Sequence, residues 1–193
     1  RSFNDFFTRK RRAEALHIDM EPSHLISPCD ALLSAYRITP ESRFTIKHCI
    51  YSLESLLRDR PLAEHYAGGL CLIFRLTPKH YHRYCYIDDG RRSDSFPLNG
   101  VLHSVRPMCI GSMPVFVENQ REYTIMDTAH FGRVIQVEVG ALMVGKICNN
   151  PGQGRIRRGE EKGHFAFGGS TIILLLEPGR IQLNSEVFRR TAR

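Results

Sequence analysis

The chain has 193 residues, of which 42% are hydrophobic and 24% charged, so it is long enough for one well-buried core and a little short for two. Its 27 basic and 20 acidic residues give a formal charge of +7, which favours an anionic partner such as a lipid surface, a nucleic acid or an acidic substrate. No apolar run approaches the roughly 18 to 20 residues that a membrane-spanning helix needs. The chain begins at Arg1 rather than at a methionine, which leaves room for an upstream signal or anchor.

The first twelve residues combine aromatic and basic side chains. Phe3, Phe6 and Phe7 have the spacing i, i+3 and i+4, so a helix would gather them on one face beside the basic run 9–12. Such a face suits an anionic membrane interface. The alternative is that the three rings fill the core while the basic residues are solvated.

Residues 25–33 present a carboxylate on a turn. Pro28 pushes Ser27 towards an extended conformation, so we expect Asp30 on a turn between two strand-like runs. A carboxylate held there could orient an imidazole. The alternative is an ordinary turn aspartate that bonds its own backbone.

The six cysteines are spread singly, with neither a paired metal-ligand spacing nor the density of a disulfide framework. This usage predicts a reducing compartment, mostly free thiols and no metal site. They are Cys29, Cys49, Cys71, Cys85, Cys109 and Cys148.

The middle of the chain predicts one helix and then one buried strand. Three leucines would share one face of a helix over residues 51–66, which Gly68-Gly69 would end. The apolar run 70–76 is typical of a buried strand. This strand leads to His82, which is well placed for proton transfer near neutral pH, and to Arg83, which could hold an anionic group. The alternative for His82 is a satisfied core or surface histidine.

Beyond Phe96 the pattern is strand and turn, with strands predicted over residues 101–105, 113–117, 122–126 and 132–139. In the last of these, apolar residues alternate with Gln136 and Glu138, as a half-buried strand requires. Glycines within 140–147 mark bends, and 151–162 reads as a polar, basic surface loop.

The whole pattern predicts a mostly β (α+β) fold with two packed sheets of the barrel-sandwich kind and a few helices. We expect one domain over residues 1–193.

The segment from Gly163 to Thr171 carries the clearest chemistry, because Gly168 and Gly169 precede Ser170 directly. Two glycines place no side chain over the Gly169 carbonyl, so the Ser170 hydroxyl can reach it, which is the geometry of an N-to-O acyl shift. Such a serine needs a base to take its proton and donors to hold the developing oxyanion. The alternative is a tight turn that enters the buried strand 172–176.

Four strings together resemble the phosphatidylserine decarboxylase family. The resemblance runs from Phe3 to about Ser185 and implies a self-cleaving, pyruvoyl-dependent proenzyme. It implies cleavage between Gly169 and Ser170 into a β subunit, residues 1–169, and an α subunit, residues 170–193. The strings are Phe-Phe-Thr-Arg at 6–9, Ser-Pro-Cys-Asp at 27–30, Tyr-His-Arg at 81–83 and Gly-Gly-Ser-Thr at 168–171.

The same resemblance implies a role for each site residue. His82, assisted by Asp30, takes the proton of Ser170, which attacks the Gly169 carbonyl; elimination and hydrolysis then leave a pyruvoyl group at position 170. The pyruvoyl cofactor condenses with a substrate amine and accepts the electrons released as carbon dioxide leaves. His82 would protonate the resulting carbanion, and Thr171 could help to stabilise the oxyanion. Neither a metal nor pyridoxal phosphate is required.

Two positions depart from the family pattern. The family has Tyr-His-Arg-x-His, with the first histidine tied to decarboxylation and the second to self-cleavage, whereas Cys85 stands at the second position here. A thiol accepts a proton only after losing its own, and beside an aspartate its pKa should rise, so Cys85 is a poor base. Either His82 serves both steps, as we favour, or another histidine such as His103 moves in, or the protein does not mature. Ala31 replaces the family glycine after Asp30.

The substrate implied is phosphatidylserine, which would be converted to phosphatidylethanolamine by a peripheral protein on the cytoplasmic face of an anionic membrane. We expect a homodimer of cleaved protomers. A soluble amino-acid decarboxylase, a non-maturing relative and a carrier module that uses His130 or Lys146 are the alternatives. We expect no nucleic-acid binding, because the basic residues are dispersed and no stacking-aromatic motif accompanies them.

Overall fold

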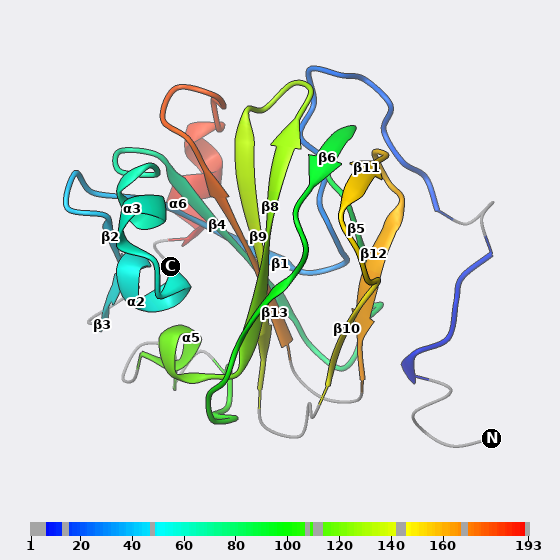
Figure 1. Ribbon diagram of the computed structural model, residues 1–193, viewed down its shortest axis with the longest axis horizontal. Helices are drawn as coiled ribbons and strands as arrows, with labels where there is room; N and C mark the ends of the chain where they lie inside the picture. Colours follow the sequence, from blue (N-terminus) through cyan, green and yellow to red (C-terminus); the bar gives the residue numbers. More distant parts are fainter. Residues whose placement is uncertain are drawn as a thin grey trace.

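The computed structural model describes residues 7–12, 16–46, 49–106, 109, 114–141, 146–166 and 170–191. Among these, the largest sheet has eight strands, all paired antiparallel, and it runs through the middle of the molecule (Figure 1). Its order is β1 (Leu32–Arg37), β4 (Leu70–Leu76), β13 (Ser170–Leu176), β9 (Arg133–Gly140), β8 (Arg121–Thr128), β6 (Gly90–Arg92) and β11 (Gly154–Ile156), with β7 (Phe96–Leu98) also pairing with β8.

Strand β13 lies at the centre of this sheet, between β4 and β9. All seven of its residues are buried, which explains why residues 172–176 form a continuous apolar run rather than an alternating one. Ile172 and Leu174 belong to one hydrophobic core, whereas Ile173 and Leu175 belong to the core on the other face. The first residue, Ser170, pairs with Leu76 of β4 and with Gly140 of β9.

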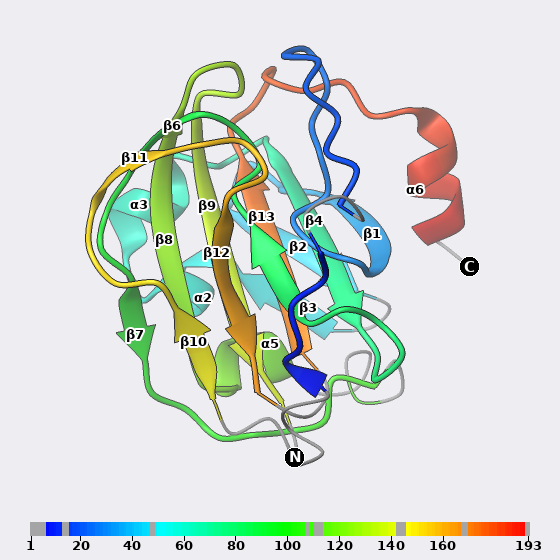
Figure 2. The same cartoon turned by 90° about the vertical axis from the view of Figure 1, so that its right-hand side faces the viewer.

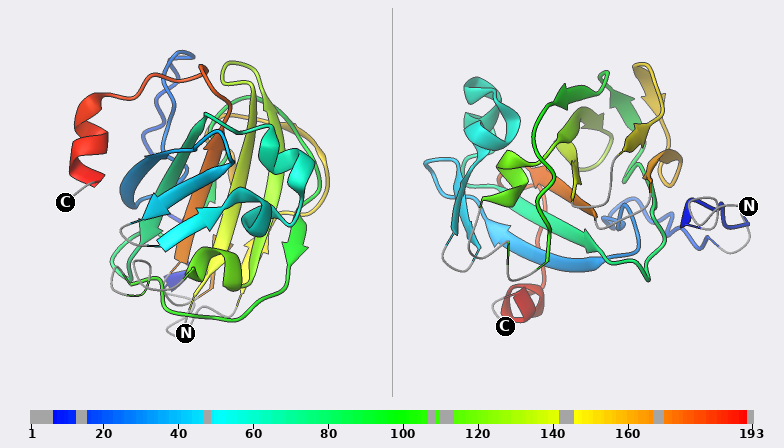
Figure 3. Two further views of the ribbon diagram at one scale, coloured as in Figure 1. Left: turned by 90° about the vertical axis from the view of Figure 1, so that its left-hand side faces the viewer. Right: turned by 90° about the horizontal axis from the view of Figure 1, so that it is seen from below.

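Short helices and a hairpin cover one face of the central sheet (Figure 3). The helices are α2 (Leu53–Leu57), α3 (Arg60–Glu64) and α5 (Val115–Glu118), and the hairpin pairs β2 (Arg43–Ile46) with β3 (Cys49–Ser52). Tyr51, Leu56 and Phe116 are each 0% exposed within this core. Helix α6 (Ser185–Thr191) lies against edge strand β1, where Thr191 Oγ1 accepts a 2.9 Å hydrogen bond from the Ala35 amide.

A three-stranded antiparallel sheet covers the other face (Figure 2). Its order is β10 (Ile147–Asn149), β12 (Glu161–Phe165) and β5 (Arg83–Cys85). Tyr84 and Phe165 of this small sheet pack in one core with Ile172 and Leu174 of β13. The mostly β fold of packed sheets with a few short helices is therefore confirmed.

The predicted helix over residues 51–66 is two helices instead of one. Tyr51 belongs to β3, and α2 ends at Arg58, whose positive φ of 53° is left-handed. Asp59 then caps α3 by accepting a 3.0 Å hydrogen bond from the Leu62 amide, and Pro61 lies in the first turn. Pro61 is tolerated there but not in a helix interior, which explains the break.

The strand predictions had mixed outcomes. The strand over 70–76 is confirmed, and those over 122–126 and 132–139 correspond to β8 and β9. The strand over 101–105 is wrong, because Val101 forms only an isolated bridge, and the strand over 113–117 is wrong because residues 115–118 form α5. A short apolar run alone does not distinguish a strand from a helix.

Two expectations about polar segments also need correction. Strand β9 is not half-buried, because Gln136 and Glu138 are both 0% exposed beneath the small sheet. The polar loop over 151–162 contains β11 and the start of β12. Of the predicted bends within 140–147, residues 142–145 lie outside the described residues, as do Phe3, Phe6 and Gly169.

Candidate active site

His82 is a buried imidazole directly before β5, with an exposed fraction of 1%. Its carbonyl accepts a 3.0 Å hydrogen bond from the Phe165 amide, so β12 holds its backbone. Its Nδ1 lies 2.8 Å from the His80 carbonyl oxygen. Because a carbonyl only accepts, Nδ1 carries the proton, and Nε2 is the nitrogen with the lone pair in the neutral ring. His82 is therefore held in the tautomer of a base that acts through Nε2.

Ser170 and Thr171 open strand β13, and both are 0% exposed. Within the part of the chain that the structure describes, neither hydroxyl has a hydrogen-bond partner. Burying an unsatisfied hydroxyl costs about 1–3 kcal/mol, so such a group calls for a functional reason. The alternation along β13 puts Ser170 on the face of Ile172, towards the small sheet, and Thr171 on the opposite face.

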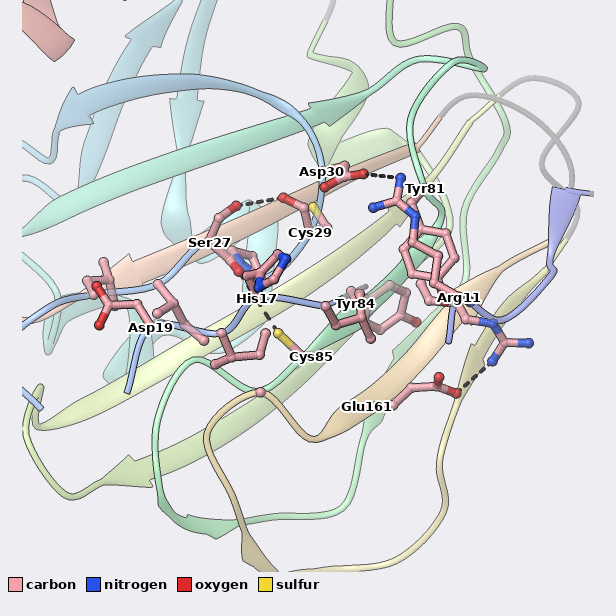
Figure 4. A pocket seen from close by; sticks show the side chains of 17 residues that line it. Arg11, His17, Asp19, Ser27, Cys29, Asp30, Tyr81, Tyr84, Cys85 and Glu161 are labelled. Carbon is pink, nitrogen blue, oxygen red and sulfur yellow. Dashed lines mark hydrogen bonds and ion pairs between the residues drawn. The ribbon is translucent and has the colours of Figure 1, made fainter. Parts of the chain in front are cut away.

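A pocket of about 500 Å³ lies between the N-terminal segment, the turn at Asp30 and the small sheet (Figure 4). Asp30 and Cys85 both line it, so the structure brings these two predicted site residues together. Its lining also includes Arg11, Leu16, His17, Ile18, Ser27, Cys29, Tyr81, Arg83 and Glu161.

Asp30 is paired with Arg11, and not with a histidine. Its Oδ2 lies 2.9 Å from Arg11 Nη2, and the two side chains are 46% and 40% exposed. Tyr81 holds Arg11 in turn, because its hydroxyl accepts a 3.0 Å bond from the Arg11 amide and its ring centroid lies 4.6 Å below the guanidinium. Among the described residues, no direct hydrogen bond links Asp30, His82 and Ser170.

Cys85 is a poor base in this environment. Burial raises the pKa of its thiol to about 11, and Sγ donates a 3.9 Å hydrogen bond to the Ser27 carbonyl. The sequence predicted a raised pKa from a nearby aspartate, whereas desolvation is the principal cause here. The thiol is therefore protonated near neutral pH.

The candidate residues lie on two sides of β5. Along residues 82–85, His82 and Tyr84 are buried and Arg83 and Cys85 are less so; Arg83, Tyr84 and Cys85 line the pocket, whereas His82 does not. Ser170 faces the same space between the sheets as Tyr84 does. His82 thus faces the space between the two sheets, whereas Cys85 lies with Asp30 in the pocket.

The histidine that lies near Cys85 is His17, and not His103 as one of the alternatives required. His103 does not line the pocket; its Nε2 pairs with Glu118 Oε2 of α5 at 3.0 Å. His17 lines the pocket with Asp30 and Cys85 (Figure 4). Sequence reasoning missed His17, because it lies in an irregular segment with no recognisable motif around it.

Lys162 is a second residue to which the sequence assigned no role. Its Nζ lies 2.9 Å from each carboxylate oxygen of Glu138 and 2.8 Å from Asn149 Oδ1. Lys162 and Glu138 are both fully buried, and burial lowers the Lys162 pKa while Glu138 opposes that shift. Lys162 lies on β12, five residues before Phe167, and Glu138 lies on β9, the neighbour of β13. The pair therefore joins the strand before the candidate cleavage site to the sheet that contains Ser170.

The family model described as phosphatidylserine decarboxylase matches residues 3–191. The chain belongs to the phosphatidylserine decarboxylase family. It is 47% identical to phosphatidylserine decarboxylase proenzyme 2 of Clostridium acetobutylicum, over 97% of this chain and 64% of that protein. It is 43% identical to the proenzyme of Clostridium novyi, over 99% and 66%, and 40% identical to that of Ruminiclostridium cellulolyticum, over 99% and 65%. The chain thus spans slightly less than two thirds of the length of these relatives.

Family membership confirms the resemblance drawn from the four motifs. In this phosphatidylserine decarboxylase family member, the thiol at the position of the second family histidine shares its pocket with Asp30. None of the helices in the described residues is both long enough and apolar enough to cross a membrane.

Proposed function

We propose that the protein is a pyruvoyl-dependent decarboxylase that converts phosphatidylserine to phosphatidylethanolamine after cleaving its own chain between Gly169 and Ser170. The match of residues 3–191 to the family supports the reaction, as do relatives named as proenzymes. The observation that carries the self-cleavage is the buried Ser170 hydroxyl, which has no hydrogen-bond partner in the described chain. A buried hydroxyl without a partner requires an explanation, and the proposed reactive role supplies one.

The proposed cleavage begins with proton transfer from Ser170 Oγ to His82 Nε2. The oxygen then attacks the Gly169 carbonyl carbon, protonated His82 returns the proton to the departing nitrogen, the peptide bond breaks and an ester forms. Loss of the α-proton of residue 170 expels the Gly169 carboxylate, and water replaces the amino group, which leaves as ammonia. The pyruvoyl group that remains supplies an electron sink for the electrons released with carbon dioxide. The His80 carbonyl fixes the tautomer of His82, so the Nε2 atom can accept the Ser170 proton and then return it.

Asp30 is proposed to stabilise the protonated imidazole. Because the His80 carbonyl holds Nδ1, this role is electrostatic and requires no direct hydrogen bond; it does require Asp30 to leave Arg11, and the exposure of their ion pair favours that exchange. Exposed ion pairs contribute only about 0–1 kcal/mol to stability, so breaking the Arg11–Asp30 pair requires little free energy. The oxyanion donor is proposed to be a backbone amide outside this ladder, because the Thr171 side chain belongs to the other face of β13 and Thr171 pairs with Arg75 of β4 and with Val139 of β9.

The two fragments, residues 1–169 and 170–193, are proposed to stay together as one domain. All seven residues of β13 are buried, and both of its edges are hydrogen-bonded, to β4 and to β9. Removing this strand would expose both cores, so separation would cost much of the folding free energy.

The lipid substrate is tested with vesicles. Protein is mixed with phosphatidylserine labelled at its carboxyl carbon in anionic vesicles, and in parallel with labelled free serine and other amino acids. Carbon dioxide from the vesicles alone supports the proposal, whereas release from a free amino acid alone would reject the lipid assignment. The formal charge of +7 supports peripheral binding at an anionic, cytoplasmic surface, and sedimentation would test the expected homodimer.

A further inference from the structure

Residues 7–12, here called the N-terminal strap, contact both sides of the candidate site. The strap runs beside the small sheet (Figure 1). The Phe7 ring centroid lies 4.0 Å from that of His82, with 38° between the ring planes. The Thr8 carbonyl accepts two hydrogen bonds from Arg83, and Arg11 pairs with Asp30.

The contact between Phe7 and His82 is buried. The two residues are 7% and 1% exposed, so the phenyl ring covers one face of the imidazole and keeps water from it. The edge of the same imidazole is held by the bond from Nδ1 to the His80 carbonyl. A face contact and an edge contact together restrict both the tilt and the rotation of the ring. An aromatic pair of this kind contributes about 0.5–1.5 kcal/mol beyond its buried area.

Arg83 fixes the strap to the same strands that hold His82. Its Nε and Nη2 lie 2.9 and 2.7 Å from the Thr8 carbonyl oxygen, and its Nη1 lies 2.7 Å from Glu161 Oε1. Arg83 follows His82 on β5, and Glu161 belongs to β12. Strands β5 and β12 therefore hold both His82 and, through the Thr8 carbonyl, the strap that carries Phe7. A planar guanidinium suits this role, because its several donors form a rigid fork.

We propose that Phe7 is a positioning residue for His82, and that the N-terminal strap is part of the active site. This inference rests on the proposed role of His82 as the base. In this proposal the Phe-Phe-Thr-Arg string holds the active-site histidine, instead of forming an aromatic surface that faces a membrane. Without the ring, the imidazole leaves the orientation that proton transfer from Ser170 requires, and misplacement of about 1 Å costs up to about 100-fold in rate.

The test replaces Phe7 with leucine, which keeps an apolar side chain and removes the aromatic face. The matched control is Phe131→Leu, because Phe131 is 5% exposed and lies beside a histidine outside the site, with 6.3 Å between its ring and that of His130. Self-cleavage is followed by intact mass during cell-free synthesis of the full-length protein. We expect Phe7→Leu to slow cleavage by about 10- to 100-fold. Phe7→Tyr, which keeps the aromatic ring, should cleave at close to the wild-type rate, and Phe131→Leu should change the rate less than about twofold.

A second readout separates positioning from folding and from the proposed function. In NMR spectra of histidine-labelled protein, the Phe7 ring current shifts the carbon-bound ring protons of His82, and Phe7→Leu should remove that shift while leaving His130 unchanged. Phe131→Leu should do the reverse. Cleavage of Phe7→Leu at the wild-type rate would overturn the inference. A wild-type protein that never cleaves would reject the proposed function instead, and the His82 signals would still report whether Phe7 orients the ring.

Discussion

Lys162 of β12 and Glu138 of β9 form a fully buried ion pair across the space between the two sheets, with Nζ 2.9 Å from each carboxylate oxygen. Asn149 extends the pair, because its amide nitrogen donates to Glu138 Oε2 at 3.0 Å and to Glu122 Oε2 at 2.8 Å. The Tyr84 hydroxyl donates to Asn149 Oδ1 at 3.1 Å. Polar contacts therefore connect β5, β8, β9, β10 and β12 beneath the candidate site.

Removing one member of this pair should destabilise the protein. Lys162→Met leaves Glu138 buried without its cation, so the free energy of unfolding should fall by about 3–5 kcal/mol. The double variant Lys162→Met/Glu138→Leu should recover most of that loss, because no isolated charge remains. Denaturant unfolding measures both, with Lys146→Met as the exposed control. A double variant as unstable as the single one would show that the charge itself matters little.

His82 should be required for self-cleavage, whereas His103 and His17 should not. His82→Ala removes the proposed base, and general-base catalysis contributes about 10²- to 10⁴-fold. His103→Ala breaks only the pair with Glu118, so its cleavage rate should stay within about twofold of wild type. Intact mass over a time course measures the rates. Normal cleavage by His82→Ala, or loss of cleavage in His17→Ala, would move the base to another histidine.

Asp30→Asn should slow cleavage without unfolding the protein. The ion pair with Arg11 is exposed, so its loss should change the free energy of unfolding by less than about 1 kcal/mol. Cleavage should slow by about 10-fold or more, because the neutral amide no longer stabilises a protonated imidazole. Asp19→Asn is the matched control, since Asp19 lines the same pocket and pairs with His24. Equal rates for the two variants would remove Asp30 from the mechanism.

Cys85→Ser should cleave within about twofold of the wild-type rate, because the protonated thiol is not the base. Intact mass over a time course measures the rate.

The raised pKa of Cys85 should also make the stability of the protein depend on pH. Burial raises the pKa of Cys85 to about 11, above the roughly 8.5 of an unfolded thiol, so its contribution to stability is complete below about pH 8.5. That contribution is lost as pH rises towards 11, because the unfolded chain then binds fewer protons.

Unfolding of wild type and Cys85→Ser between pH 8 and 11 measures this effect. The wild-type protein should lose stability faster than the variant across that range. Iodoacetamide should modify Cys85 slowly at pH 8 in the folded protein. Rapid modification, or parallel pH curves, would show that the thiol ionises near its ordinary pKa and would return Cys85 to consideration as a base.

The sequence predicted those features that depend on local pattern. The run at 172–176 is wholly apolar and the strand at 70–76 is apolar except at Arg75, so both were recognised as buried strands. Pro61 and Asp59 contained the information that splits the predicted helix, but the three leucines before them dominated the pattern. The helix α5 was missed because four residues are too few for a helical period to appear.

The long-range contacts of the site could not be predicted in this way. Glu138 alternates with apolar residues like any solvent-facing residue, and its burial depends on a small sheet built from segments on both sides of it in the sequence. The Phe7–His82 contact joins residues 75 positions apart. The motifs predicted His82, Asp30 and Ser170 as site residues, but only the fold reveals that Asp30 pairs with Arg11.

The intact mass of the purified protein under denaturing conditions tests self-cleavage most directly, with and without phenylhydrazine, which traps a ketone. We expect two fragments separated at Gly169/Ser170, the smaller with a blocked terminus that phenylhydrazine modifies. Ser170→Ala should give one unmodified chain, which for these 193 residues has a mass of 22.1 kDa. A single uncleaved wild-type chain would contradict the proposed mechanism and would leave a family member that keeps the fold without maturing.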